Sequence, residues 1–466
     1  MPHVQNILTT PSTIDMVKED FPLHNVCTRD KARLTFGVEL EMAIASLPNS
    51  KEDPSPDDPR DIRCLTPSNS GWTHPTQPKI FYTLDHIARV LTEAGIPSSP
   101  EGVQPPPPKS HWVVAEDSTI LAPHCTSPHG SFVEPNSAEE DEAAMYDYKG
   151  IEVITPAFFY STAALNAIRQ TCKFLTSTFR INTNISSGLH VHVGNQSQGL
   201  SFKTTRNLFA TVLTFEPQID QIHGKYRLRD NHHTRGLRAH SELHTLVENE
   251  EDVAKAGLYH LMHNCKNKED LAEATKAEGN SGWDSRMGYS MSNLMSNDGD
   301  GKITFEFRQH IASVDPDVVE NWTRFCVGLV EFADSVDSAV LEDFLSRHIG
   351  DTPETFGIGK VCAAVGLPHL AEYYTQRVRE QKARDAATER EEWIAARELE
   401  KRNAQAKREQ DAEAKKKRAA KKKPSFFSLF RRRANDAPHV EVDPRLIHHM
   451  TGEPTTSWLE YPMSYL

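Results

Sequence analysis

The chain has 466 residues, of which 38% are hydrophobic, so it can bury a full core in one large or two ordinary domains. Its longest apolar stretches, such as Phe325 to Phe332, are far shorter than the roughly 20 residues that span a bilayer, and no signal sequence opens it, so we expect a cytoplasmic or nuclear protein. The net charge is -13 although the C-terminal part is basic, so the rest of the chain is strongly acidic, which argues against non-specific nucleic-acid binding by the folded part. Seven scattered cysteines without a CxxC pair indicate reduced thiols.

Strand and helix candidates alternate along the chain. Alternating apolar and polar residues predict strands, and apolar residues at helical spacing predict helices. Stretches rich in proline, serine and acidic residues are predicted surface loops or insertions: Leu47 to Gln77, Ile96 to Ser110 and Pro123 to Tyr146. The predicted strands are Arg33 to Ile44, His111 to Asp117, Gly150 to Thr155, Gly188 to Gly194 and Lys302 to Ile311, and the predicted helices are Ile80 to Ala94, Phe158 to Phe179, Phe202 to Ile222 and Asp317 to Phe332.

The C-terminal part has a different composition. From about His369 to Lys423 it is rich in Ala, Glu, Arg and Lys, which predicts a long solvated helix or a partly disordered arm. From Glu372 to Arg433 the chain holds 20 Lys and Arg against 11 Asp and Glu, and basic clusters there flank several phenylalanines. Such a segment could contact an anionic membrane or a protein partner, or serve as a nuclear localisation signal. The alternative is a charged helix that only increases solubility.

The first predicted strand carries two carboxylates on one face. In LTFGVELEM, residues 34–42, successive side chains point to opposite sides, so Glu39 and Glu41 lie together opposite an apolar face. Two like charges so close either face water or hold a cation. On this strand alone, a solvated face is the simpler interpretation.

A histidine pair shows the same division in GLHVHVG, residues 188–194. His190 and His192 share one face, three apolar residues share the other, and the flanking glycines permit close backbone approach. A neutral imidazole is a common ligand of divalent ions. An isolated pair on a strand also fits a surface site or a position behind the ligands.

The last predicted strand, residues 303–310, places Thr304, Glu306, Arg308 and His310 opposite three apolar residues. Magnesium bound to nucleotide phosphates requires carboxylates, together with guanidinium groups directed at the same anion. A simple ion pair is the alternative for Glu306 and Arg308.

Two more strands contribute one acid each, Asp117 after WVVAE and Glu152 within IEVITP. Each alone is unremarkable. Several strands that each pair an apolar face with ligands on the other fit one shared site.

In this order, the motifs resemble those of the amidoligases, relatives of glutamine synthetase and glutamate-cysteine ligase. The resemblance covers about Arg33 to Phe332 and implies an ATP- and magnesium-dependent carboxylate–amine ligase. In such an enzyme a substrate carboxylate takes the γ-phosphoryl group and an amine attacks the acyl phosphate. The motifs are GVELE at 37–41, Asp117-Ser118, Glu152 before Thr155-Pro156, GLHVHVG at 188–194 and TFEFR at 304–308.

The resemblance also implies roles for individual residues. Arg308 would stabilise charge on the transferring phosphoryl group or bind the acid, and it forms the expected catalytic set with Glu306 and Asp117. His192 and Asp117 match motif positions suited to contacts with the nucleotide, the substrate or neighbouring ligands. The implied ligands of two or more magnesium ions are Glu39, Glu41, Glu152, His190 and Glu306.

The family often has an arginine-bearing loop where this chain has KYRLRDNHH, residues 225–233. Arg227 and Arg229 there, together with Arg308, are the expected phosphate contacts. Further candidates before the last strand are Arg286, Tyr289 and Asn293. The paired histidines and the long stretch to Asp284 depart from the family pattern, so a charged surface loop is an equal alternative.

We therefore expect an α+β domain with a curved, mainly antiparallel sheet that forms a glutamine-synthetase-like funnel, with helices on its convex face. Its substrates would be a small-molecule or peptide carboxylate and an amine. A phosphotransferase on the same type of sheet and an inactive binding or scaffold protein are the alternatives. The expected parts are a tail over 1–30, a catalytic domain over 31–350, a charged helical region over 351–423 and a basic, aromatic tail over 424–466.

Overall fold

The computed structural model describes residues 34–47, 51–62, 78–103, 108–123, 146–223, 227, 234–247, 250–279, 286–295, 302–384, 386, 390, 397 and 401. The tails predicted over 1–30 and 424–466 lie outside the described residues, as does Arg229. The chain divides into two compact units, Met1–Glu389 and Arg390–Leu466, and the fold below belongs to the first. In the described part, no helix has the length and apolar character needed to cross a membrane.

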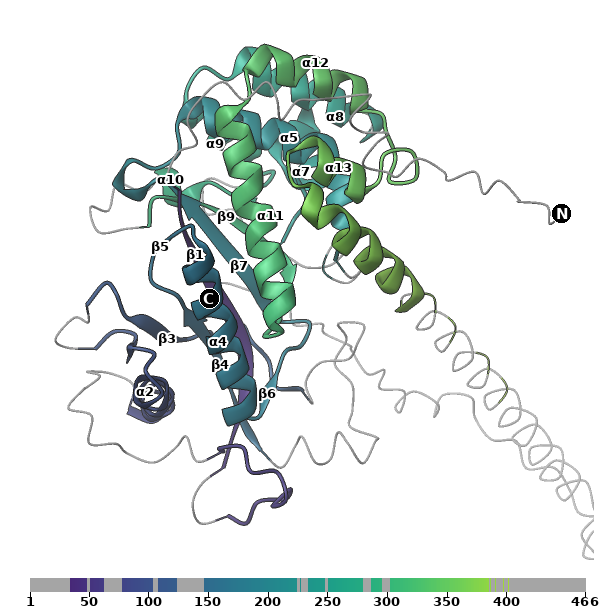
Figure 1. Ribbon diagram of the computed structural model, residues 1–466. Coiled ribbons are helices and arrows are strands. Elements are labelled where there is room, and N and C mark those ends of the chain that lie inside the picture. The colour runs from purple at the N-terminus through teal and green to yellow at the C-terminus, as the bar shows by residue number, and fades with distance from the viewer. Residues whose placement is uncertain are drawn as a thin grey trace, which may run out of the picture. The chain divides into compact units, whose positions relative to one another are not determined.

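A mostly antiparallel, open sheet forms the centre of this unit (Figure 1). Its strands follow the order β2-β3-β4-β1-β7-β9-β8, and β5 and β6 also pair with β1. β2 and β3 are parallel, and the other neighbouring strands in this order, as well as β5 and β6 with β1, pair in antiparallel fashion. The strands are β1 Thr35–Ser46, β2 Ser98–Pro100, β3 Trp112–Glu116, β4 Asp147–Ile154, β5 Phe158–Phe159, β6 Ile181–Asn182, β7 Gly188–Gly194, β8 Tyr289–Ser290 and β9 Thr304–Ile311.

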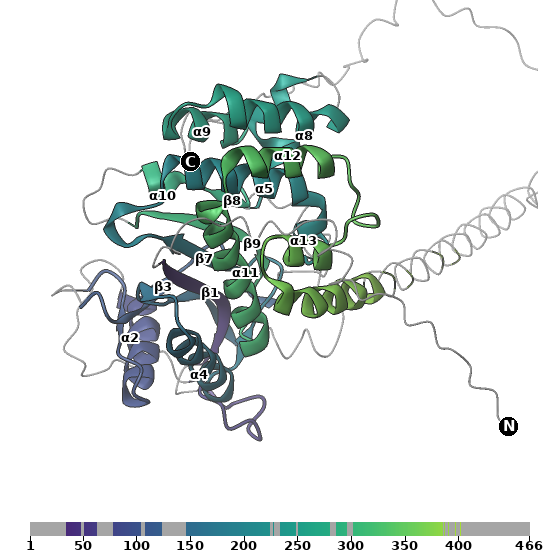
Figure 2. The same cartoon turned by 45° about the horizontal axis from the view of Figure 1, so that its top comes forward.

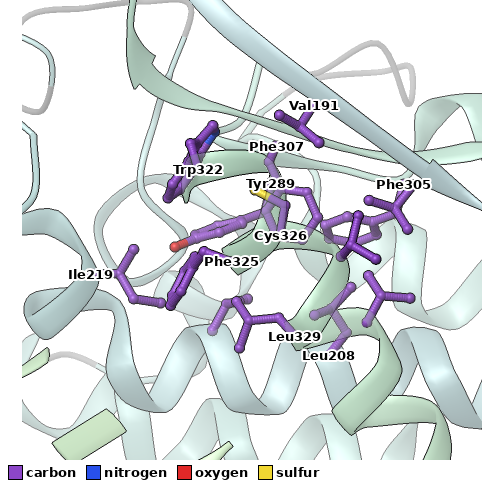
Figure 3. Close-up of a cluster of buried hydrophobic side chains, with 14 of the residues drawn as sticks. Val191, Leu208, Ile219, Tyr289, Phe305, Phe307, Trp322, Phe325, Cys326 and Leu329 are labelled. Atoms are coloured by element: carbon purple, nitrogen blue, oxygen red, sulfur yellow. The ribbon is translucent and has the colours of Figure 1, made fainter. Parts of the chain in front are cut away.

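Helices cover the apolar face of the sheet. Helix α11 packs against α4, α5 and β7 (Figure 1), and α8, α12 and α13 pack against α5 (Figure 2). Trp322, Phe325 and Cys326 of α11 lie over Phe305 and Phe307 of β9 (Figure 3). The helices are α2 Pro78–Glu93, α4 Thr162–Thr178, η3 Gln196–Gln198, α5 Phe202–Asp220, α7 Leu237–His240, η4 Glu242–Leu246, α8 Glu250–Tyr259, η5 His260–Asn264, α9 Lys268–Thr275, α10 Ser292–Met295, α11 Pro316–Ser335, α12 Ser338–His348 and α13 Ile358–Ala364.

Local sequence signals set several boundaries. The Asp315 side chain accepts hydrogen bonds from the first turn of α11, and Pro316 follows it, as a helix start requires. Ser161 caps α4, so this helix begins at Thr162 and the prediction that it starts at Phe158 is wrong; Phe158 instead pairs with β1. Part of the loop predicted over 96–110 forms β2, whose three residues are buried.

The region from residue 351, which we expected to be a charged helical region apart from the catalytic domain, contributes to the same core. Ile358, Cys362 and Tyr374 are buried in the hydrophobic cluster that contains the sheet, and Val378 is its last member among the described residues. A helical segment runs over residues 368–384.

The pairing of β7 with β9 contains a bulge. His192 lies opposite Glu306 and Val191 opposite Phe307, but Leu189 lies opposite His310, so β9 has one extra residue. His310 therefore faces the helices, where its ring centroid is 5.1 Å from that of Trp322. The prediction that His310 shares the polar face of Glu306 is wrong, because strict alternation fails at the bulge.

A proline inside α5 leaves backbone groups that a side chain satisfies. Pro217 has no N–H to donate to the carbonyl oxygen of Leu213. The Nε atom of Arg238 donates to that oxygen at 2.8 Å, and its Nη2 donates to the carbonyl oxygen of Thr214 at 2.7 Å. Buried Glu216 in turn accepts the backbone N–H groups of Leu237 and Arg238 at the start of α7.

Candidate active site

Strand pairing brings the predicted ligands to one face of the sheet. Glu39 lies opposite His190, Glu41 lies opposite Glu152, and His192 lies opposite Glu306. Residues directly opposite each other in an antiparallel pair share a face. Strands β1, β4, β7 and β9 therefore supply one polar surface, and the side chains of Glu39, Glu41, His190, His192 and Glu306 on it are buried.

The imidazole nitrogens lie close to the carboxylate oxygens. His190 Nδ1 is 3.2 Å from Glu39 Oε2 and 3.2 Å from Glu41 Oε1. His192 Nε2 is 3.0 Å from Glu39 Oε1 and 3.7 Å from Glu306 Oε1. The other ring nitrogen of His192 lies 3.0 Å from the hydroxyl oxygen of Thr304, which fixes the ring orientation.

Three of these side chains are close enough to one another to share a metal ion. One ligand atom each from Glu39, His192 and Glu306 lies within 4.8 Å of the others. His192 Nε2 is buried, lies 3.0 Å from Glu39 Oε1 and has no satisfied hydrogen bond among the described residues. A bound cation would satisfy this nitrogen. Two carboxylates and an imidazole form a donor set that suits divalent ions such as Mg²⁺ or Mn²⁺.

Two of the carboxylates are held in the charged form. Burial opposes ionisation of Glu39, but His192, His190 and Lys302 outweigh it and lower the pKa of Glu39 well below its usual value. Burial likewise opposes ionisation of Glu306, and His192 and Arg308 lower its pKa. Both carboxylates of the candidate metal triad therefore carry negative charge at neutral pH.

The pKa values of the neighbouring carboxyl groups, those of Glu41 and Glu152, are raised instead. Burial raises the pKa of Glu41, although its Oε2 accepts the N–H of Gly188 at 2.6 Å. Burial, and then the charges of Glu39 and Glu41, raise the pKa of Glu152 to about 9. Glu152 is thus protonated at neutral pH, and a cation beside it would favour its ionised form.

Two cations contact the triad directly. Arg308 donates a hydrogen bond to Glu306 Oε1, and Lys302 donates one to Glu39 Oε1. Lys302 is not among the residues expected at the site, although it is the first residue of the last predicted strand. It has the same parity as Thr304 and Glu306, so following the alternation back to the start of that strand would have identified it.

Asp117 lies beside this face at the end of β3. Its backbone N–H donates to the carbonyl oxygen of Gly150 at 3.1 Å, and its Oδ1 accepts hydrogen bonds from the N–H and hydroxyl of Thr119. Its charge contributes to the raised pKa of Glu41 and Glu152. Asp117 therefore shapes a turn and adds to the acidic field of the site.

The predicted phosphate contacts occupy different environments. Arg227 is 2% exposed and donates to the carbonyl oxygens of Ser187, Arg308 and Gln309, which surround the bulge. Tyr289 is buried among apolar side chains on the helix-covered face (Figure 3), so its prediction as a phosphate or substrate contact is wrong. Arg286 is exposed, and Asn293 is half-buried in α10.

A cavity of about 110 Å³ adjoins the triad. Its lining includes Gly37, Thr155, His192, Lys302 and Thr304. A larger cavity of about 790 Å³ is lined by Trp112, Phe158 and Phe174, and its lining includes none of the candidate metal ligands. Of these two cavities, the small one is lined by the candidate ligands Glu39 and His192.

Comparison with known proteins finds a match to one family model. Residues 32–330 match a family model described as putative amidoligase enzyme. No curated protein and no solved structure matches the chain. The matched range covers more than half of the chain and contains all the strands that carry the polar face. The chain therefore belongs to this amidoligase family.

Proposed function

We propose that the chain is an ATP- and Mg²⁺-dependent carboxylate–amine ligase that forms an amide or peptide-like bond. The observation that carries the proposal is the buried triad of Glu39, His192 and Glu306, with Arg308 on Glu306, in a member of the amidoligase family. The open, mostly antiparallel sheet supports a glutamine-synthetase-like funnel as the setting of this chemistry.

The proposed reaction has two steps. A carboxylate oxygen of the acid substrate attacks the γ-phosphorus of ATP, and the bond to ADP breaks. The amine nitrogen then attacks the acyl carbon, inorganic phosphate leaves and the nitrogen loses a proton. Acyl phosphate formation makes the second step feasible because phosphate is a far better leaving group than oxide.

The carboxylate and imidazole side chains have one proposed role, metal binding, and the guanidinium group of Arg308 has another, stabilisation of the phosphoryl group. Glu39, His192 and Glu306 would hold one magnesium ion, and His190, Glu41 and Glu152 would contribute to a second position. A bound ion would shield the phosphate oxygens and polarise the γ-phosphoryl group. Arg308, anchored by Glu306, presents a fixed guanidinium group that stabilises negative charge on the transferring phosphoryl group.

Hydroxylamine, a small amine that traps acyl phosphates as hydroxamates, provides the test. The full chain is incubated with ATP, Mg²⁺, hydroxylamine and a panel of carboxylic acids, and hydroxamate and ADP are quantified. We expect acid-dependent formation of both, its loss in Glu39→Gln, and its retention in Glu93→Gln, which alters an exposed carboxylate on α2. Because a released acyl phosphate also reacts with hydroxylamine, ADP release is measured without any amine as well, and fast release there, with a phosphorylated acid as the product, would instead indicate a phosphotransferase. If Mg²⁺ and ATP do not bind, the ligase proposal is refuted.

A further inference from the structure

One oxygen atom of the site has two competing uses. Glu39 Oε1 accepts a hydrogen bond from Lys302 Nζ, and the same oxygen lies 3.0 Å from His192 Nε2. Glu39 also belongs, with His192 and Glu306, to the triad whose ligand atoms converge. A cation bound by the triad and the Lys302 ammonium group would therefore contend for one carboxylate.

The Lys302 side chain has room to move away from the triad, whereas the buried Glu39 side chain does not. The Lys302 side chain is 49% exposed, whereas that of Glu39 is 9% exposed. Lysine carries its charge on a flexible four-carbon stem. Lys302 also lines the cavity of about 110 Å³ beside the triad, together with Gly37 and Thr155, so the ammonium group has a space next to it.

We propose that Lys302 is an internal cation that competes with the metal ion for Glu39, so that metal binding displaces the ammonium group toward the adjoining cavity. This inference rests on the proposed metal-dependent function. A divalent ion gains Glu39, His192 and Glu306 together, whereas the ammonium group has Glu39 as its contact in the triad. The exchange favours the metal, but Lys302 sets how much metal is needed.

Metal affinity measured with Mn²⁺ as the probe tests the competition, because free Mn²⁺ is quantified directly by its spin resonance signal. For the full chain, Lys302→Met should bind Mn²⁺ at least about tenfold more tightly than the unchanged protein. Lys149→Met is the matched control, since Lys149 pairs with Asp147 on β4, and its affinity should not change. Unchanged or weaker binding in Lys302→Met would overturn the proposal.

A second variant separates direct competition from the general effect of removing a positive charge. If Lys302 acts through Glu39, the gain from Lys302→Met should disappear when Glu39 is already Gln, because the shared carboxylate is gone. A gain of the same size in that background would show that only the long-range field changes, and the proposal would fail.

Chemical labelling tests the displacement of Lys302 in the unchanged protein, so this experiment does not depend on the folding of a variant. An amine-reactive acylating reagent, followed by mass spectrometry, should modify Lys302 several-fold faster when Mn²⁺ is present, while Lys149 should react at a constant rate. A constant rate at Lys302 despite Mn²⁺ binding would refute this inference and leave the ligase proposal intact. Absence of Mn²⁺ binding in the unchanged protein and in Lys302→Met would overturn both.

Discussion

Two histidines buried behind the active-site sheet should make the stability of the fold depend on pH. His223 and His310 are 3% and 2% exposed, and their ring centroids are 5.3 Å apart, beside Trp322. Burial lowers the pKa of His310 to about 4, and the positive charges of Arg377 and Arg227 act in the same direction. Burial, followed by the charge of His310, lowers the pKa of His223 well below its usual value.

The sign of the effect follows from the two states. An unfolded histidine titrates near pH 6.5, so between that pH and about 4 the unfolded chain binds a proton that folded His310 does not. The stability due to neutral His310 is present above pH 6.5 and is lost as the pH falls through this window. From pH 7 to pH 5, His310 alone should lower the free energy of unfolding by about 2 kcal/mol, and His223 adds to the loss.

Urea denaturation at pH 7, 6 and 5 measures this dependence. His310→Asn removes the titration while keeping a side-chain N–H near the position of Nδ1, which lies 2.7 Å from the carbonyl oxygen of Ile311. The variant should be less stable at pH 7 but should lose about 2 kcal/mol less than the unchanged protein on acidification. His263→Asn, at an exposed histidine on η5, is the control. Equal pH slopes in His310→Asn and the unchanged protein would refute the reasoning.

Three further changes probe the fold and the site. Arg238→Met should lower the free energy of unfolding by about 3 kcal/mol in urea, because two carbonyl groups lose their hydrogen-bond donor and buried Glu216 loses the nearby positive charge. The exposed-pair control Arg89→Met should cost less than about 1 kcal/mol, and similar losses would contradict the role assigned to Arg238. Glu306→Gln should shift the Mg²⁺ requirement of hydroxamate formation to higher concentration. Arg308→Lys should keep Mg²⁺ and ATP binding but lose on the order of a hundred-fold in turnover. Near-normal turnover in both variants would show that β9 is not part of the active site. Deleting residues 390–466 should leave the melting temperature unchanged within a few degrees, since these residues form a separate compact unit, and insolubility would show that they support the core.

The sequence predicted the site strands well where alternation is strict. In β1 and β7 every second residue is apolar, so the shared face of Glu39, Glu41, His190 and His192 follows from parity alone. Which strands are neighbours does not follow from parity. The order β4-β1-β7-β9 comes from the structure alone, because β1 and β7 are separated by about 140 residues of chain.

Other features have no local signal. The bulge in β9 involves no glycine or proline, so periodicity placed His310 on the polar face. Tyr289 precedes the strand in a polar context, and only the pairing of β8 with β9 turns it into the core. The short helices between residues 237 and 279 pack on α5 and lack the long apolar stripe that identifies α11.

The bulge in β9 also influences the electrostatics of the acidic face. An extra residue interrupts the regular ladder, and the carbonyl oxygens around it receive the guanidinium group of Arg227, whose charge acts on Glu41. The bulge thus holds the permanent positive charge of Arg227 next to the acidic side chains of the site. Any substitution or deletion that restores a regular β9 would remove the acceptors that hold this background charge. The pKa of Glu41 would then change although Glu41 itself had not been mutated.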